Sequence, residues 1–141
     1  MDKTLIRGKQ KARKIALQAL YQWYMSDYDL SIIEQQFYAK NNMLKINKEY
    51  FQQLLYDIPK NITNLENLLV PFLERDTHDP IELTVLRIGT YELLYCPEIP
   101  YKVVIDEAIM LTKEFGAQDG HRYINGVLNK IARQVRKYEI E

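Results

Sequence analysis

The chain contains no apolar run approaching the roughly 18 residues that a membrane span requires. Its start, MDKTLIRGKQKARK, carries charges where a secretory signal would need an apolar stretch. We therefore expect a cytoplasmic protein without a membrane segment. A length of 141 residues is enough for one domain to bury its own core, and we expect residues 1–141 to form a single domain.

Cysteine is almost absent. Cys96 is the single cysteine, so no disulfide can form within the chain. A zinc site with four ligands would have to combine this thiol with the two histidines and with carboxylates. We expect no metal site.

Glycine is also scarce, and its positions exclude the common nucleotide-binding loops. None of the five glycines falls in a GxGxxG or GxxxxGK[ST] window. Among possible nucleophiles, Cys96 lies between a buried helix and a proline turn, Ser26 follows a helix end, and Ser31 is placed to cap a helix. A catalytic role for Asp119 and His121 would need a second converging group, which the sequence does not offer. We expect no catalytic residues, no cofactor and no enzymatic activity.

The formal net charge of zero conceals a strong asymmetry along the chain. Residues 1–14 carry a net charge of +5, residues 15–118 carry −7, and residues 119–141 carry +2. The stretch 121–138 contains no acidic residue. If the fold brings the two basic ends together, their field would attract phosphates, and the acidic middle could meet a basic protein. The alternative is a solvated charge run on a flexible start.

The spacing of apolar residues is helical in the first half of the chain. One apolar stripe predicts a helix from about Lys9 to Met25. Ser31 and Glu34 have the spacing of a capping box at the start of a short second helix. Apolar residues over 51–72 keep a single phase across Pro59, which favours one long helix kinked at that proline.

The second half is also helical, and no segment alternates as a strand would. Asp79 and Pro80 supply a cap and a first-turn proline for a central buried helix that ends near residue 95. Within it, Gly89 would allow a neighbour to approach closely. The next helix starts at about Pro100 and stops at Gly116, and the last begins near residue 119. We predict an all-α fold of six or seven helices.

The stretch GAQDGHRYINGVL, residues 116–128, is interpreted as a helix start that attracts anions. Asp119 is placed to cap the helix, beside the exposed amides of its first turn. Tyr123 either packs inward or offers a ring on which an RNA base can stack. We interpret Asn125 and Gly126 as structural, with the glycine in a close contact between helices and the asparagine bonded to a neighbouring backbone.

Tyr21 has the same two interpretations as Tyr123. It lies off the apolar stripe that contains Trp23, on the helix face that carries Lys14 and Gln18. A basic helix start followed by an exposed tyrosine is typical of an RNA-binding surface, and an ordinary surface tyrosine is the alternative.

Taken in order, these segments resemble the NusB family of transcription antitermination factors over nearly the whole chain. The matching runs are KARKIALQALYQW (11–23), ELTVLRIGTYELLY (82–95) and IPYKVVIDEAIMLTKEFGAQDGHRYINGVLNKIAR (99–133), of which the last is the most specific. The resemblance implies two three-helix bundles packed crosswise. It also implies a protein that binds the boxA element of nascent rRNA leader transcripts together with NusE, a small-subunit ribosomal protein, and that joins NusA and NusG on RNA polymerase.

The resemblance also implies site residues. The family's arginine-rich helix start falls on Lys9, Gln10, Lys11 and Arg13, and its RNA-facing tyrosine on Tyr21. Its second RNA element falls on Asp119, Arg122 and Tyr123, and the acidic positions that meet NusE fall on Asp76 and Glu82. Lysine or glutamine at three of the arginine positions removes bidentate phosphate contacts, and Tyr123 replaces the usual phenylalanine.

The sequence leaves two other functions open. NusB-like helical domains also precede the catalytic domain of rRNA cytosine methyltransferases, so the chain could be the RNA-docking domain of such an enzyme; the end of the sequence at Glu141 argues against it. A DNA-binding helix-turn-helix protein would need a short turn before a recognition helix, and no such pair stands out.

Overall fold

The computed structural model describes residues 2–74 and 79–140, and these ranges contain eight α-helices and two short 3₁₀ helices, joined by loops, and no strand. This confirms the all-α fold. It gives one or two helices more than expected, because one predicted helix is divided and a short extra one is present. The chain separates into two compact units, Met1–Lys60 and Asn61–Glu141, and each is described by itself.

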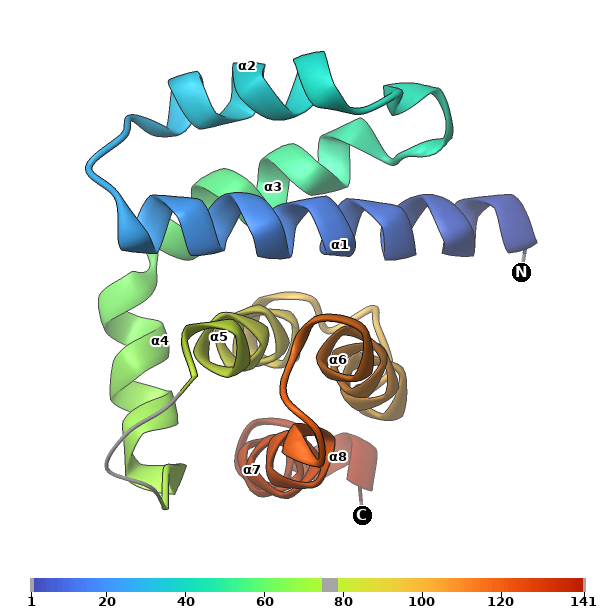
Figure 1. The fold of residues 1–141 in the computed structure, drawn as a ribbon. Coiled ribbons are helices and arrows are strands. Elements are labelled where there is room, and N and C mark those ends of the chain that lie inside the picture. The colour runs from blue at the N-terminus through green and yellow to red at the C-terminus, as the bar shows by residue number, and fades with distance from the viewer. Residues whose placement is uncertain (1, 75–78, 141) are drawn as a thin grey trace. The chain divides into compact units, whose positions relative to one another are not determined.

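The first unit contains α1 (Lys3–Met25), α2 (Leu30–Lys40), the 3₁₀ turn η1 (Met43–Lys45) and α3 (Lys48–Lys60). The long helix α1 packs against both α2 and α3 (Figure 1). Apolar side chains from all three helices are fully buried between them, including Leu17, Ile33, Phe51, Leu54 and Leu55. This core holds α1 in place along the length that its apolar stripe predicted.

The basic start of the chain is part of α1, not a flexible extension. The side chain of Asp2 accepts a hydrogen bond from the amide of Thr4 at 2.8 Å, which caps the helix, so α1 begins six residues before the predicted Lys9. Gly8 is buried, and its carbonyl accepts a bond from the amide of Asn47. The lysines and arginines of residues 3–14 are therefore displayed on a regular helix.

The predicted capping box at Ser31 and Glu34 is wrong. Helix α2 starts one residue before Ser31, and Glu34 is buried instead. Its carboxylate accepts hydrogen bonds from the hydroxyls of Tyr38 and Tyr56, the latter at 2.6 Å, and from the amide of Gln52 at 2.9 Å. These bonds join α2 to α3, so the carboxylate serves the packing of two helices rather than the start of one.

The prediction of one kinked helix over residues 51–72 is also wrong. Pro59 is accommodated in the last turn of α3, and the helix is broken two residues later, at Asn61, before α4 (Ile62–Leu69) begins. The break coincides with the boundary between the two units. The apolar phase continues across it, since Ile58 of α3 and Leu65 of α4 are both buried.

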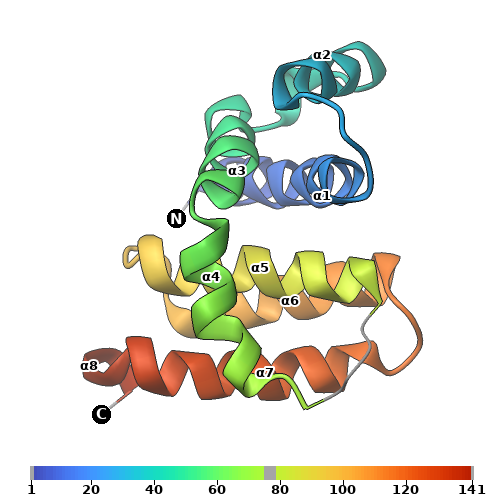
Figure 2. The ribbon, with the colours of Figure 1, turned by 90° about the vertical axis from the view of Figure 1, so that its left-hand side faces the viewer.

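The second unit contains α4, the 3₁₀ turn η2 (Val70–Phe72), α5 (Pro80–Tyr95), α6 (Tyr101–Phe115), α7 (Gly120–Val135) and the short α8 (Lys137–Ile140). Figure 2 shows α5, α6 and α7 from the side, with α4 crossing them. As predicted, Asp79 caps α5 through the amide of Ile81, Pro80 is its first residue, and most of this helix is buried.

Helices α5 and α7 run parallel and touch in their middles. A Cβ added to Gly89 would lie 2.8 Å from a methyl group of Leu128, which is fully buried and has little room to move. The close approach predicted at Gly89 is therefore confirmed. A side chain there would overpack the core, which typically costs about 1–3 kcal/mol.

Arg136 joins the carboxyl ends of these two helices. It follows the last residue of α7, and its guanidinium donates to the carbonyls of Leu93 (2.7 Å), Cys96 (2.9 Å) and Ile99 (2.9 Å), and more weakly to that of Glu92. These carbonyls belong to the last turn of α5 and the turn after it. Those of Glu92 and Cys96 also accept from the amides of Cys96 and Ile99, so Arg136 adds a charged donor to an end of the helix that few backbone amides can serve. Glu139 completes the arrangement by accepting from Arg136 and from the amide of Tyr101.

We predict that Arg136→Met lowers the free energy of unfolding by about 3–5 kcal/mol, because several buried carbonyls lose a charged donor. The measurement is urea unfolding followed by far-ultraviolet circular dichroism. Lys137→Met is the matched control, since Lys137 is the exposed neighbour, and it should change stability by less than about 0.5 kcal/mol. Similar losses in the two variants would contradict the role of Arg136.

The Glu34 cluster predicts a pH dependence of the first unit. Burial alone would raise the pKa of Glu34, but the hydrogen bonds from Tyr38, Tyr56 and Gln52 outweigh it and hold the pKa below 4.5. The Glu34 carboxylate in turn raises the pKa of Tyr56 to about 12. The contribution of the Glu34 carboxylate to stability is present above pH 4.5 and is lost as the pH falls through the lowered pKa that Glu34 has in the folded protein. The contribution of the Tyr56 hydroxyl to stability is lost as the pH rises from 10 towards 12.

Fluorescence of Trp23, the single tryptophan, reports on the first unit and can follow this loss. The urea concentration at which half of the protein is unfolded should be constant between pH 5 and 9 and should fall below and above this pH range. In Glu34→Gln the acid-side fall should shrink, and an unchanged acid-side fall would assign it to another group.

Candidate nucleic-acid interface

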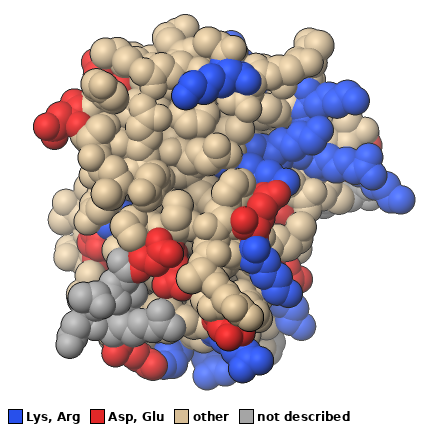
Figure 3. Space-filling view, in the orientation of Figure 1, with Lys and Arg blue, Asp and Glu red and all other residues tan. Residues whose placement is uncertain are grey.

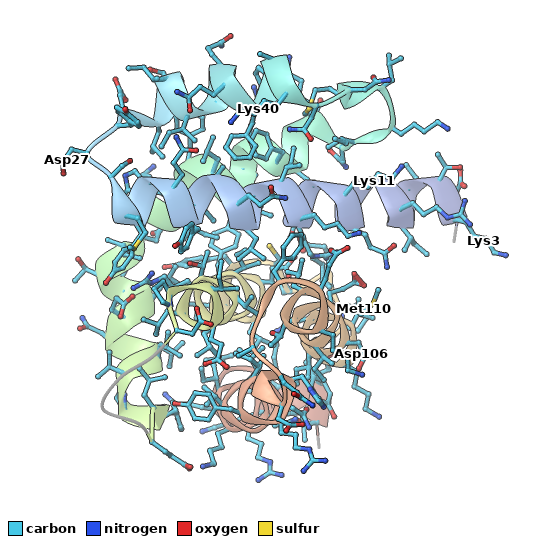
Figure 4. The ribbon with its side chains drawn as sticks, in the orientation of Figure 1. Lys3, Lys11, Asp27, Lys40, Asp106 and Met110 are labelled. Atoms are coloured by element: carbon cyan, nitrogen blue, oxygen red, sulfur yellow. The ribbon has the colours of Figure 1, made fainter. Side chains whose placement is uncertain are left out.

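The N-terminal half of α1 presents a row of cations to solvent. Lys3, Arg7, Lys11 and Lys14 are all exposed. Lys3, Arg7 and Lys14 are separated by four and seven residues, so they share one face of the helix, and Lys11 lies beside them. Figure 3 shows lysine and arginine side chains gathered at this end of α1, and Lys3 and Lys11 project from it in Figure 4. This basic row, residues 3, 7, 11 and 14, can receive a polyanion.

Two of the expected RNA-binding residues face the other way. The ammonium of Lys9 lies 4.9 Å from the centre of the Tyr50 ring, and the guanidinium of Arg13 lies 5.5 Å from the same centre. Tyr50 belongs to α3 and is buried, and Arg13 is only 4 % exposed. Arg13 therefore stabilises the contact between α1 and α3 and offers no surface to a phosphate. Lys9 is half-buried.

Tyr21 extends the face of the basic row by two turns. It is half-buried and lies seven residues after Lys14, which places both on one side of α1. A half-buried residue keeps part of its surface exposed, as stacking on a base would require. Trp23, which was expected in the core, is also half-buried.

The start of α7 is built differently from the prediction. Asp119 occupies the position before the helix, but its side chain accepts no capping bond and its backbone is left-handed, with φ 67° and ψ 0°. The negative group beside the helix start is Glu82, whose carboxylate oxygen lies 2.3 Å from where a Cβ on Gly120 would be. Gly120 is required there because any side chain would displace this carboxylate. The Asp119 carboxylate is exposed and is not used as a cap.

Helix α7 also holds the segment that follows η2. The hydroxyl of Tyr123 accepts a hydrogen bond from the amide of Glu74 at 3.1 Å, and the ammonium of Lys130 pairs with the Glu74 carboxylate at 2.5 Å. The hydrogen bond and charge of Lys130 hold the pKa of Glu74 below its ordinary value. The hydroxyl that distinguishes Tyr123 from phenylalanine thus has a structural partner, and its half-buried ring remains beside exposed Arg122.

Two structural interpretations in α7 are wrong. Gly126 is exposed, and a Cβ added to it would meet nothing within 4 Å, so no helix packs against it. Asn125 is exposed too, and it bonds the side chain of Asn129 one turn later rather than a neighbouring backbone. The sequence suggested a close contact because mid-helix glycine is costly, but the packing glycine of this pair of helices is Gly89.

The two acidic positions expected to meet a protein partner have different outcomes. Asp76 lies outside the described residues. Glu82 is 2 % exposed, so it has almost no surface to offer a partner, and its carboxylate lies against Gly120 at the start of α7.

Within residues 2–74 and 79–140, no three histidine, cysteine or acidic side chains are grouped as metal ligands. No helix in this described part of the chain is both long and apolar enough to cross a membrane.

The model of the NusB family matches residues 10–133. The chain belongs to the NusB family. This match covers both elements discussed above, the basic face of α1 from residue 10 onward and the start of α7. The resemblance expected from the three sequence runs is therefore confirmed.

Relatives named transcription antitermination protein NusB support the assignment. The one from Legionella pneumophila is 60% identical over 99% of this chain and 97% of its own length. That from Nitrosococcus oceani is 47% identical over 93% of this chain and 89% of its own. The solved structure of T. maritima NusB superimposes with a TM-score of 0.77 at 27% identity, covering 93% of this chain and 95% of that one.

The geometry of Asp119 predicts an unusual response to substitution. Asp119→Gly should leave stability unchanged or raise it by about 1 kcal/mol, because glycine adopts the left-handed backbone without strain, whereas Asp119→Ala should lower it by a similar amount. Thermal unfolding of the two variants and of the wild type measures which of the three proteins is the most stable. A loss of stability in Asp119→Gly would restore the capping role that the sequence suggested.

Proposed function

We propose that this protein is a transcription antitermination factor that binds boxA RNA of nascent rRNA leader transcripts together with NusE. With that partner it joins the RNA polymerase complex that contains NusA and NusG, and it performs no catalysis of its own. The observation that carries the proposal is the 60% identity to a relative of that name over 99% of the chain. The cytoplasmic location expected from the sequence fits this role.

Two elements of the chain are proposed to contact the RNA. In the first unit these are Lys11 and the other cations of the basic row, followed by the ring of Tyr21. In the second unit they are Asp119, Arg122 and Tyr123 at the start of α7. Arg13 is left out because it is buried, and Lys9 contributes only to the extent that it leaves the Tyr50 ring.

Single-stranded RNA suits these elements better than duplex DNA. The cations can neutralise phosphates, and Tyr21 and Tyr123 offer rings, a combination that is typical of single-strand recognition. Four to six phosphate contacts would give a slope of about −3 to −4 in a plot of log affinity against log salt concentration. Binding by this protein alone should therefore be weak and sensitive to salt, and NusE would add affinity by supplying a second contact on the same RNA.

The contribution of Glu82 to NusE binding is proposed to be indirect. Its carboxylate lies against Gly120, so a change at Glu82 would disturb Asp119 and Arg122 first. A lysine there would place a cation beside the positive end of α7 and would damage the fold, so Glu82→Lys is a poor test of partner binding. The part played by Asp76 remains a prediction.

The alternative function, docking RNA for a cytosine methyltransferase, would require a catalytic domain. The relative from Legionella pneumophila is matched over 97% of its own length, which supports a function exercised without such a domain.

The RNA proposal predicts that Lys11→Ala combined with Lys14→Ala weakens binding to boxA RNA and makes the salt slope shallower by about 1.4, since each phosphate contact on a single strand contributes about 0.7. Fluorescence anisotropy at several salt concentrations, with and without NusE, measures both quantities. The fold should be unaffected because both side chains are exposed.

Two further variants sharpen this experiment. Lys40→Ala, at the end of α2, removes a lysine outside the proposed site and should leave affinity and slope unchanged. Arg13→Ala should lower the stability of the first unit instead of acting on RNA alone. A wild-type titration curve for the Lys11 and Lys14 double variant would count against the basic row as an RNA site.

A further inference from the structure

The solvent-facing side of α7 carries a polar and basic face, of which only the first residue, Arg122, belongs to the RNA site proposed above. It consists of Arg122, Asn125, Gly126, Asn129 and Arg133, which follow one another at steps of three and four and therefore share one side of the helix. All are exposed except Asn129, which is half-exposed. We call these five residues the α7 face.

Gly126 is the first indication that this face binds something. A glycine inside a helix lowers helix stability by about 1 kcal/mol relative to alanine. At Gly126 no packing contact offsets this loss, since a Cβ there would meet nothing within 4 Å. What the glycine does provide is bare backbone in the middle of an otherwise bulky polar face. A ligand can approach the helix more closely there than over any side chain.

The amides beside Gly126 are already held in position. The side chain of Asn129 donates to both the backbone carbonyl (2.9 Å) and the side-chain oxygen (2.8 Å) of Asn125. This pairing uses the oxygen of Asn125 and the amino group of Asn129, so the amino group of Asn125 and the oxygen of Asn129 take no part in it. Side-chain amides in fixed positions suit the donor and acceptor edges of bases.

The charge of the α7 face is entirely positive. Arg122 and Arg133 make no ion pair with another described residue, and no acidic residue occurs between positions 121 and 138. The nearby Lys130 differs, because it is neutralised by Glu74. The two arginines are eleven residues apart, so they lie about 16 Å from each other along the helix and could each hold a separate phosphate.

The composition of the face also favours one class of ligand. It contains no aromatic or aliphatic side chain, whereas protein interfaces depend on buried apolar anchors. Arginines that flank amides and a bare glycine fit an extended, negatively charged strand with polar edges. We propose that single-stranded RNA continues from the start of α7 along the α7 face, so that the bound RNA is longer than the segment at Asp119, Arg122 and Tyr123. This extension rests on the proposed RNA binding and adds Asn125, Gly126, Asn129 and Arg133 to it.

The test compares two RNAs by fluorescence anisotropy with the full chain: boxA RNA, and the same RNA lengthened by uridines at one end or at the other. We expect one of the lengthened RNAs to bind the wild type more tightly. Arg133→Ala should remove that gain and reduce the salt slope for that RNA by about 0.7, while leaving the short RNA unaffected. Gly126→Gln should act in the same direction by covering the bare backbone, although glutamine is the better helix former.

Lys102→Ala, an exposed lysine of α6, is the matched control and should change neither RNA. The proposal is overturned if the lengthened RNAs bind no better than the short one, or if Arg133→Ala weakens the binding of both RNAs equally. It is also overturned if the α7 face binds an acidic protein and not RNA. Failure of the wild type to bind the short RNA would instead reject the proposed function itself, so the two results can be told apart.

Discussion

The second unit depends on the parallel contact between α5 and α7. The two helices are joined at three levels: the carboxylate of Glu82 against Gly120 at their starts, Leu128 against Gly89 in their middles, and Arg136 on the α5 carbonyls at their ends. Neighbouring helices in sequence usually pack antiparallel, and here α6 returns the chain so that α7 can run beside α5 in the same direction. This arrangement places the start of α7 next to the start of α5.

That placement gives the start of α7 its chemistry. The Glu82 carboxylate lies beside the start of the helix, and Asp119, whose backbone is left-handed, makes no capping bond and keeps an exposed carboxylate next to Arg122 and Tyr123. The Tyr123 hydroxyl and Lys130 then bind Glu74, which ties the same helix to the segment before α5. Structural contacts thus occupy one side of α7 and leave the other side polar, basic and open.

The sequence predicted features that depend on neighbours along the chain. Asp79 and Pro80 predict the start of α5 because a capping residue and a first-turn proline are adjacent in the sequence. Gly89 predicts a close helix contact because it is a glycine within an apolar helix. Predictions failed where the partner is distant. Arg13 and Glu34 were misjudged because Tyr50 and Tyr56, which engage them, belong to α3 and no local pattern reveals them. The capping role predicted for Asp119 fails because its backbone is left-handed, whereas a capping residue is extended, and the local sequence does not reveal this. For the site, residue types could be assigned from the family, but their exposure could not.

The bonds that close the two units span very different lengths of chain. In the first unit, Glu34 reaches Gln52 and Tyr56 across 18 and 22 residues, whereas in the second Arg136 reaches Cys96 and Leu93 across 40 and 43. Closing a longer loop costs more chain entropy before any contact forms, and folding slows as contacts become less local. The first unit should therefore acquire its structure sooner. A chain caught between these two steps would display the basic row of α1 while the start of α7 was still unformed.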